Sequence, residues 1–192
     1  MLRRWAVSET FSDFYRPLDD EHRKETLRLL KSKDQNREIK GINRALAGRR
    51  NYVESIPRKA HWCLANLPVT QDQFSALRTI NDPGWVSHSG GTRKLVDAAI
   101  NLRNTPGTDS RVDAIMSAFK QGNVEMQGIT LIGQSKKGPF TIAEGTGRLV
   151  SLYLCCVAEQ SSLICQSEIE VALGITPIRW GFSKPVAPAD RA

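Results

Sequence analysis

The clearest candidate for chemistry in this 192-residue sequence is the run from Glu144 to Arg148. Glycine lets a chain turn tightly, and the first turn of a helix presents unpaired N–H groups that favour a phosphate or another anion. Arg148 adds a guanidinium that grips two anionic oxygens at once. Glu144 would serve as a base or hold a metal beside the phosphate. The sequence therefore predicts Glu144 and Arg148 as catalytic residues, and Gly145, Thr146, Gly147 and Arg148 as phosphate contacts.

The same run also has a purely structural interpretation. Glycine is common where a strand turns into a helix. Glu144 and Arg148 are four residues apart, so they could pair with each other and shape the turn. Spacing alone leaves both interpretations open.

A second glycine-then-basic run, Gly90 to Lys94, precedes another expected helix. It lacks the spacing of a P-loop. Gly91, Thr92 and Arg93 are predicted to complete a phosphate pocket opposite the first run. The alternative is an ordinary loop at the start of a helix.

His88 and the tryptophans are weaker candidates. His88 and Ser89 have no third partner that would make a hydrolase triad, and a lone loop histidine is expected to be exposed. Trp62, Trp85 and Trp180 could stack on bases, but packing in the core is the favoured interpretation.

The elements that must position these residues are short strands and helices. Val112, Ile115, Met116 and Phe119 recur at helical spacing and give one apolar face. We predict an α+β fold, with a small mixed sheet, helices packed against it and a helical basic N-terminal region. Its expected elements are strands at 61–67, 128–133, 140–144 and 169–173, helices after Thr70, at 95–102, at 109–121 and from Gly145–Arg148 onward, and a polar loop at 85–94.

The order helix, strand, turn, strand and then Gly145-Thr146-Gly147-Arg148 resembles the ParB/sulfiredoxin-like superfamily. Its members share a G-x-x-R element between a short strand and an apolar helix. The element reads G-E-R-R in ParB and G-C-H-R in sulfiredoxin, and related free-serine kinases carry an acidic residue followed by G-H and a nearby arginine. The resemblance implies a small α/β fold over about residues 60–175 whose loop binds nucleotide phosphates through Gly145 and Arg148. It also implies that Glu144 matches the acidic residue used by the kinase-like members.

The run departs from each of these relatives in a way that bears on function. Thr146 stands where sulfiredoxin has its essential cysteine, so sulfinic-acid reduction is not expected. Thr146 and Gly147 replace the acidic residue and the arginine of the ParB element, which argues against its role in chromosome segregation. No histidine stands at the third position, unlike in the kinase-like pattern.

The net charge of +7 is unevenly distributed. Residues 1–59 hold 15 Lys and Arg against 9 Asp and Glu, whereas residues 60–192 hold 12 against 11. We therefore predict a basic helical N-terminal region at 1–59, a ParB/sulfiredoxin-like core at 60–182 and a flexible tail at 183–192. Such a basic region could bind a nucleic-acid backbone, although interleaved acidic residues also suit a solvated helical hairpin.

Within this N-terminal region, helices are expected after the acidic start at 18–21 and over the basic stretch 37–50. In the second of these, Ile39, Ile42, Leu46 and Ala47 would give an apolar stripe. Gly48 to Asn51 would end it.

Three function classes follow from these observations. The leading prediction is a protein that binds a nucleotide or a phosphorylated small molecule. Phosphoryl transfer or phosphohydrolysis would use a nucleoside triphosphate or diphosphate with magnesium, and whether the protein is an enzyme stays open. The alternative is a non-enzymatic DNA-binding regulator or partitioning-type module acting through residues 1–59. A nuclease, with Asp97 or Asp109 meeting Glu144, is weaker.

The composition and the N-terminal sequence limit the expected location and partners of the protein. No apolar window has the length of a membrane span, and the N-terminus does not read as a signal peptide, so a cytoplasmic protein with no membrane partner is expected. The four cysteines lack zinc-ligand spacing to a histidine, so no metal site is predicted. Buried free thiols are the favoured interpretation of these cysteines.

Overall fold

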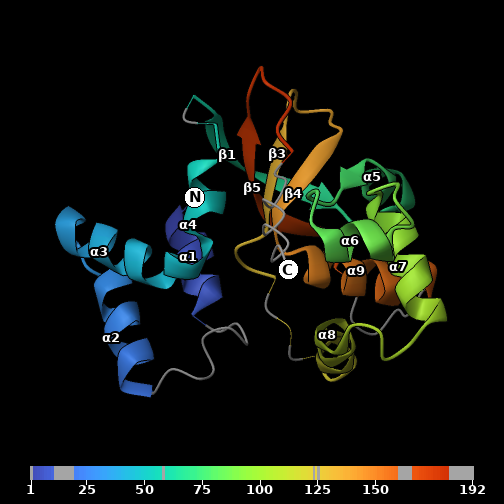
Figure 1. Cartoon of the computed structure of the whole chain (residues 1–192), viewed down its shortest axis with the longest axis horizontal. Helices are drawn as coiled ribbons and strands as arrows, with labels where there is room; N and C mark the ends of the chain where they lie inside the picture. Colours follow the sequence, from blue (N-terminus) through green and yellow to red (C-terminus); the bar gives the residue numbers. More distant parts are fainter. Residues whose placement is uncertain are drawn as a thin grey trace, which may run out of the picture.

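The computed structural model describes residues 2–10, 20–57, 59–122, 124, 126–159 and 166–181. A five-stranded mixed sheet stands at the centre with helices on both sides (Figure 1). The four N-terminal helices lie on one side of the sheet, and the helices that follow the first strand lie on the other. The fold is therefore α+β, as predicted.

The sheet has the strand order β1-β5-β3-β4-β2. β1 and β5 pair antiparallel, β5 and β3 pair parallel, β3 and β4 form an antiparallel hairpin, and β4 and β2 pair parallel. Because β2 and β4 are parallel, their carboxyl ends meet at the same edge of the sheet. The bounds are β1 His61–Pro68, β2 Leu77–Arg78, β3 Thr130–Gly133, β4 Phe140–Glu144 and β5 Glu168–Ile175.

One face of the sheet is covered by the helices after β1. Leu131, Ile142 and Val171 point into this core, where they meet fully buried helical residues such as Leu95 and Leu149. α9 continues directly into a π-helical turn, η2. The elements are α5 Gln71–Ser75, α6 Pro83–His88, α7 Leu95–Asn104, α8 Ser110–Lys120, α9 Thr146–Leu152 and η2 Tyr153–Ala158.

The opposite face of the sheet is covered by the N-terminal region. Trp5 is fully buried there, and its ring meets Tyr52 edge-on at 5.3 Å. Ile132 and Ala143 supply the sheet side of this second core, so residues of the N-terminal helices share a core with the strands. The elements are α1 Leu2–Glu9, α2 Asp20–Leu30, α3 Gln35–Ala45, η1 Ala47–Arg49 and α4 Arg50–Glu54.

The expected strands and helices of the core are present, with two corrections. Residues 85–88 of the predicted polar loop belong to helix α6, which begins at Pro83 because Asp82 caps the Gly84 N–H and Pro83 suits the first helical turn. The two-residue strand β2 lies where we expected helix, since it is defined by its pairing with β4 alone.

Within the N-terminal region the predicted stripe is confirmed for Ile42 and Leu46, which pack in the second core, but not for the exposed Ile39 and Ala47. Ile39 is 45 % exposed, whereas Gly41 and Ala45 are buried, because α3 packs on α2 through its small residues. The chain does not stop after Gly48 but continues through η1 into α4. The predicted tail at 183–192 lies outside the described residues.

The cysteines only partly match the free-thiol interpretation. Cys155 is free and buried, and Cys63 is free but exposed. Cys156 is disulfide-bonded, which the prediction of free thiols missed. In the part of the chain that the structure describes, no helix is long and apolar enough to cross a membrane.

Candidate functional site

The turn between β4 and α9 requires a glycine at its first position. Gly145 has φ +93°, in the left-handed region that side chains rarely adopt. A Cβ added to it would lie 2.8 Å from Ile129 Cγ1, far inside contact distance. The turn is therefore compact, with Thr146 only 9 % exposed at the start of α9. It fixes where Glu144 and Arg148 point.

Arg148 bridges the two ends of this turn. Its Nη2 lies 3.6 Å from Glu144 Oε1, and its Nη1 donates a hydrogen bond to the Gln127 carbonyl. The two charged side chains are mostly buried, with 15 % of Arg148 and 22 % of Glu144 exposed. The pairing that sequence spacing allowed is therefore present.

Two further charges reach the same place from the N-terminal region. Glu9, at the end of α1, is 3 % exposed and accepts a hydrogen bond from Arg49 Nε at 3.2 Å. Both Glu9 and Arg49 act electrostatically on Glu144. We call Glu9, Arg49, Glu144 and Arg148 the buried charge cluster. Sequence reasoning missed Glu9 and Arg49, since only the folded chain brings them to the end of β4.

Burial is the largest influence on the pKa values of Glu144 and Arg148. It raises the pKa of Glu144, with Glu9 adding to the rise and Arg148 and Arg49 opposing it. Burial likewise lowers the pKa of Arg148, while the two carboxylates oppose that change. Desolvation penalises each charged form, so the cluster holds its charges at a cost in stability.

Tyr52 ties the N-terminal region to the strand that carries Glu144. Its hydroxyl donates a hydrogen bond of 2.6 Å to the Ala143 carbonyl, one residue before Glu144. Burial raises the pKa of Tyr52, and the negative charge of Glu144 adds to the rise. Tyr52 therefore fixes the end of β4 as a neutral hydrogen-bond donor.

The side chains of the second predicted loop, from Gly90 to Lys94, have a different set of partners. Gly91 is exposed, with nothing near its α-carbon on the side-chain face. The hydroxyl of Thr92 donates to Asp97 at 2.6 Å. Arg93 donates two hydrogen bonds, of 3.1 and 2.8 Å, to the Thr79 carbonyl. Its electrostatic neighbours are Arg78 and Arg179, whereas those of Arg148 are Glu144 and Glu9. That the two loops form one phosphate pocket stays a prediction.

His88 is not the exposed loop residue that we expected. It closes helix α6, where its ring meets Trp85 edge-on at 5.5 Å and its Nε2 lies 3.6 Å from Asp109. Asp109 also caps α8, and the Arg111 guanidinium lies over the Trp85 ring. Trp85 is thereby part of the packing, as favoured from the sequence.

The carboxylates proposed for a nuclease have local roles. Asp97 accepts from Thr92 at the start of α7, and Asp109 accepts from two backbone N–H groups of α8. Across the described ranges, no group of three or more His, Cys, Asp or Glu side chains could hold a metal ion.

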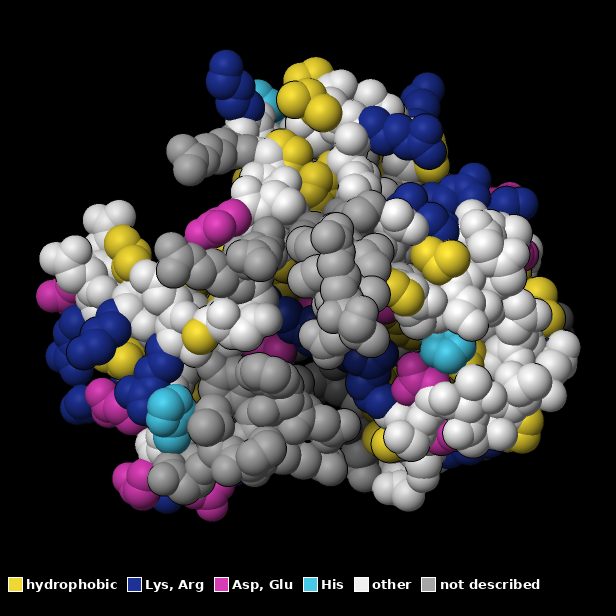
Figure 2. All heavy atoms as spheres, viewed as in Figure 1, with side chains coloured by type: hydrophobic (Ala, Val, Ile, Leu, Met, Phe, Trp, Pro, Cys, Tyr) yellow, Lys and Arg dark blue, Asp and Glu magenta, His cyan; other side chains and the backbone are white. Residues whose placement is uncertain are grey.

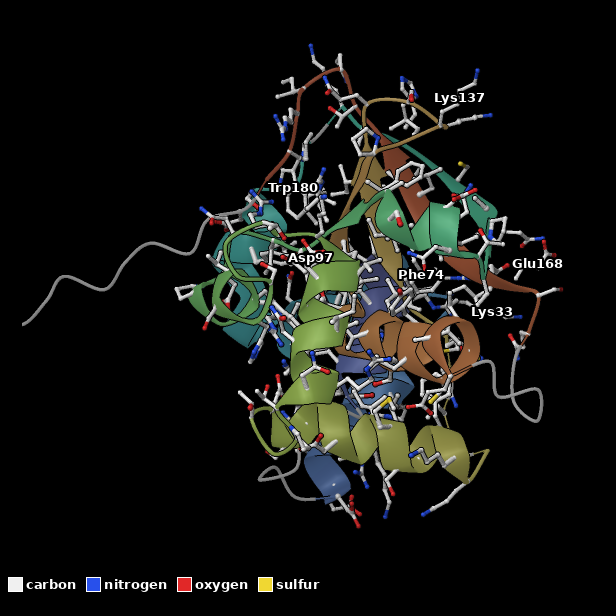
Figure 3. All side chains as sticks on the ribbon, turned by 90° about the vertical axis from the view of Figure 1, so that its right-hand side faces the viewer. Lys33, Phe74, Asp97, Lys137, Glu168 and Trp180 are labelled. Atoms are coloured by element: carbon white, nitrogen blue, oxygen red, sulfur yellow. The ribbon has the colours of Figure 1, made fainter. Side chains whose placement is uncertain are left out.

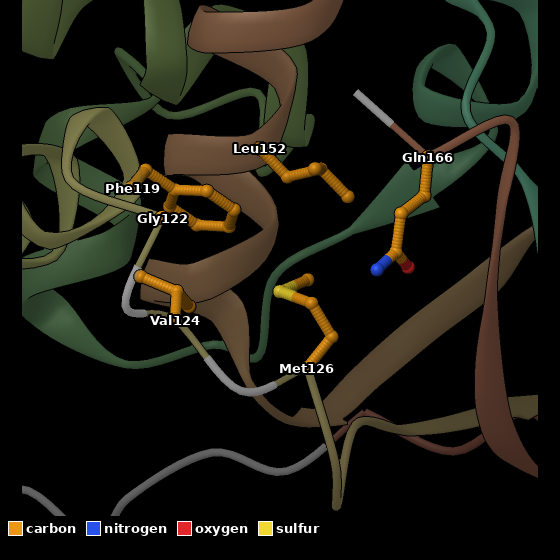
Figure 4. A pocket seen from close by; sticks show the side chains of 6 residues that line it. All are labelled: Phe119, Gly122, Val124, Met126, Leu152 and Gln166. Carbon is orange, nitrogen blue, oxygen red and sulfur yellow. The ribbon is translucent and has the colours of Figure 1, made fainter. Parts of the chain in front are cut away.

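A small cavity of about 100 Å³ lies at the far end of α8 (Figure 4). Its lining combines apolar side chains, among them that of Leu152 at the end of α9, with the polar side chain of Gln166. The lining residues are Phe119, Gly122, Val124, Met126, Leu152 and Gln166. None of them is ionisable, so this cavity offers no group for acid–base chemistry.

Comparison with known proteins yielded no match to a family model, to a curated protein or to a solved structure. The resemblance to the ParB/sulfiredoxin-like superfamily therefore stays a prediction that rests on Gly145 to Arg148. The evidence for function comes from this chain's own geometry.

Proposed function

We propose that the protein binds the phosphate group of a nucleotide or of a phosphorylated small molecule at the loop from Glu144 to Arg148. The buried charge cluster is the observation that carries this proposal. Burying charges costs free energy, and perturbed ionisable groups gather at functional sites more often than elsewhere. Here two guanidiniums and two carboxylates gather at the carboxyl end of a strand, beside a turn that only glycine accommodates.

Arg148 is the phosphate-binding group in this proposal. Its partners among the described residues include one carboxylate oxygen and one backbone carbonyl. A phosphate offers the same guanidinium two oxygens with more charge, so it would replace Glu144 as the partner. Thr146 and the backbone N–H groups of Gly145 and Gly147 lie on the same turn and would complete the contacts.

Once Arg148 binds the phosphate, Glu144 would be the group that transfers a proton. The pKa of Glu144 is already raised by burial, and losing Arg148 as partner would raise it further. A carboxyl group with a raised pKa suits general acid–base transfer of a proton to or from the phosphorylated group. Magnesium bound with a nucleoside triphosphate or diphosphate would neutralise phosphate charge, and Glu144 is the loop carboxylate able to face it.

Thermal unfolding with added nucleotides tests the binding step. Nucleoside mono-, di- and triphosphates are screened with and without magnesium against wild type, Arg148→Ala and Arg148→Lys. At least one phosphate ligand is expected to raise the Tm of wild type, because a ligand that binds only the native state stabilises it. The shift should vanish in Arg148→Ala and shrink in Arg148→Lys, which keeps a charge but loses the fork.

The control is Arg103→Ala, which removes an exposed guanidinium from the last turn of α7. It should keep the full ligand-induced shift. Each shift is taken from the variant's own unliganded Tm, so a less stable variant still reports binding. An equal shift in wild type and in a folded Arg148→Ala would overturn the assignment.

A further inference from the structure

Three arginines meet beside the edge strand β2, which pairs with the first residues of β4, whereas the buried charge cluster lies at the last residue of β4. Arg78 ends β2, Arg93 lies in the loop before α7, and Arg179 lies beyond β5. Arg78 and Arg179 both act electrostatically on Arg93, and Arg78 Nη1 reaches the Thr92 carbonyl at 3.5 Å. We call Arg78, Arg93 and Arg179 the arginine cluster.

The backbone holds Arg93 in this position under strain. Its φ is +59°, which is uncommon for a residue with a side chain. The Arg93 N–H donates to the Ser89 hydroxyl at 2.9 Å, and its carbonyl accepts from the Thr79 N–H at 2.8 Å. Nε and Nη2 of its guanidinium also donate to the Thr79 carbonyl, so both the backbone and the side chain of Arg93 are held in place. Strain of this kind persists where the surroundings over-determine a position, commonly at binding sites.

Like charges surround Arg93. Burial lowers the pKa of Arg93, and the positive charges of Arg179 and Arg78 lower it further, with no carboxylate among its electrostatic neighbours. None of the three arginines forms an ion pair with the carboxylates of the described residues. Such a cluster is repulsive by itself and is relieved by an external anion.

Lysines extend the positive charge along the same edge. Lys94 pairs through the backbone with Arg78. The tip of the β3–β4 hairpin carries Lys136 and Lys137, both exposed, and Figure 3 shows Lys137 projecting outward from it. The segment with Arg179 runs beside this hairpin, because Gln134 donates to the Pro177 carbonyl at 3.1 Å. Figure 2 shows Lys and Arg side chains gathered over this hairpin and the sheet edge next to it.

The N-terminal region differs sharply, although it holds most of the surplus charge in the sequence. Six of its cations form ion pairs with carboxylates of the described residues. These ion pairs are Arg3 with Glu38, Arg4 with Glu170, Arg23 with Asp20, Lys24 with Glu21, Arg28 with Glu25 and Arg49 with Glu9. The arginine cluster differs from these six cations, because none of its three arginines has such an ion pair.

We propose that the arginine cluster, extended by Lys94, Lys136 and Lys137, binds the phosphate backbone of a nucleic acid. The cations are spread along the sheet edge from the hairpin to the start of α7, which suits a row of phosphates better than one small anion. Guanidiniums also match the paired oxygens of a phosphodiester. A membrane surface is typically met by an amphipathic helix with an apolar face, and the charged edge here is built from strand, hairpin and loop.

Fluorescence anisotropy tests this surface directly. The full chain is titrated into a labelled 20-nucleotide single strand and a 20-base-pair duplex over a range of salt concentrations. Binding should weaken steeply as salt rises. Arg78→Gln/Arg179→Gln should weaken binding at least tenfold at low salt and lower the slope of log K against log salt by about one for each lost phosphate contact. Arg93 is left intact because it holds the loop.

Arg23→Gln/Arg28→Gln is the matched control, since it also removes two positive charges but takes them from ion pairs on α2. Its affinity should stay within about twofold of wild type. Equal losses in the two double variants would overturn the proposal, as would no binding by wild type at low salt. Binding to vesicles rich in phosphatidylserine with no binding to either nucleic acid would overturn it in favour of a membrane partner.

Discussion

Two turns of this chain share a sequence pattern and differ in their electrostatics. Each places glycine before a basic residue at the start of a helix, α9 in one case and α7 in the other. In the first, Arg148 faces Glu144 and Glu9 in a largely buried setting. In the second, Arg93 faces Arg78 and Arg179. One guanidinium is thus held by internal anions, and the other lies among cations.

A run of glycine followed by arginine therefore specifies a turn, but it does not specify the charges that surround the turn. That environment comes from distant segments, namely α1 and η1 at the first turn and the chain after β5 at the second. A small ligand at the first turn must compete with internal carboxylates. Among the described residues, an external polyanion at the second meets no carboxylate paired with Arg93, so the two sites should respond differently to the same substitutions.

Removing each arginine should give the largest contrast. Arg148→Ala leaves Glu144 and Glu9 mostly buried with less compensating charge, and we expect a loss of roughly 3–4 kcal/mol in the free energy of unfolding. Arg93→Ala loses two hydrogen bonds but also relieves repulsion, so we expect a loss of about 1 kcal/mol or less. Urea unfolding measures both values. A larger loss in Arg93→Ala than in Arg148→Ala would contradict the proposed difference between the two turns.

Adding a methyl group to each turn should give the next contrast. Gly145→Ala meets both a left-handed φ and a Cβ contact of 2.8 Å with Ile129. Gly91 also has a positive φ, +86°, but its Cβ would meet nothing within 4 Å. Backbone strain alone costs about 1 kcal/mol, whereas strain with a clash should cost roughly 2–3 kcal/mol. The difference between the two losses, measured by urea unfolding, isolates the packing of β3 against the first turn.

Local pattern was enough to predict much of the core. The apolar face of residues 109–121 and the alternation around Ile142 specify α8 and β4 by short-range periodicity, and both elements are present. β2 has two residues and exists only through its pairing with β4. No local signal announces a strand of that kind.

The candidate site could be predicted only in part. The run from Glu144 to Arg148 carries its own turn chemistry, so its geometry follows from glycine and from i, i+4 spacing. Glu9 and Arg49 join it through the packing of α1 and η1 on the sheet, which depends on contacts such as Trp5 with Tyr52. The charge surplus of residues 1–59 could be counted from the sequence, but which of those cations form ion pairs depends on the fold.

The smallest effect expected is a pH dependence that separates a buried carboxylate from an exposed one. Burial raises the pKa of Glu144 in the folded protein, so its neutral form favours folding and its ionised form opposes it. The stability this group contributes is complete below the unfolded pKa and is lost as the pH rises through the folded pKa. The free energy of unfolding of wild type should therefore fall relative to Glu144→Gln as the pH rises from the ordinary glutamate range toward neutrality.

Glu25 provides the control with the opposite sign. A side-chain hydrogen bond from Arg28 lowers the pKa of Glu25, so its ionised form favours folding, and that contribution is lost as the pH falls through the lowered value. Wild type should therefore lose stability relative to Glu25→Gln on acidification, the reverse of the trend for Glu144→Gln. Urea unfolding of the three proteins between pH 3 and pH 8 measures both trends. If Glu144→Gln and Glu25→Gln diverge from wild type in the same direction, Glu144 is stabilised as a carboxylate by Arg148 and Arg49, and the cluster is an ordinary salt bridge with no raised acid for proton transfer.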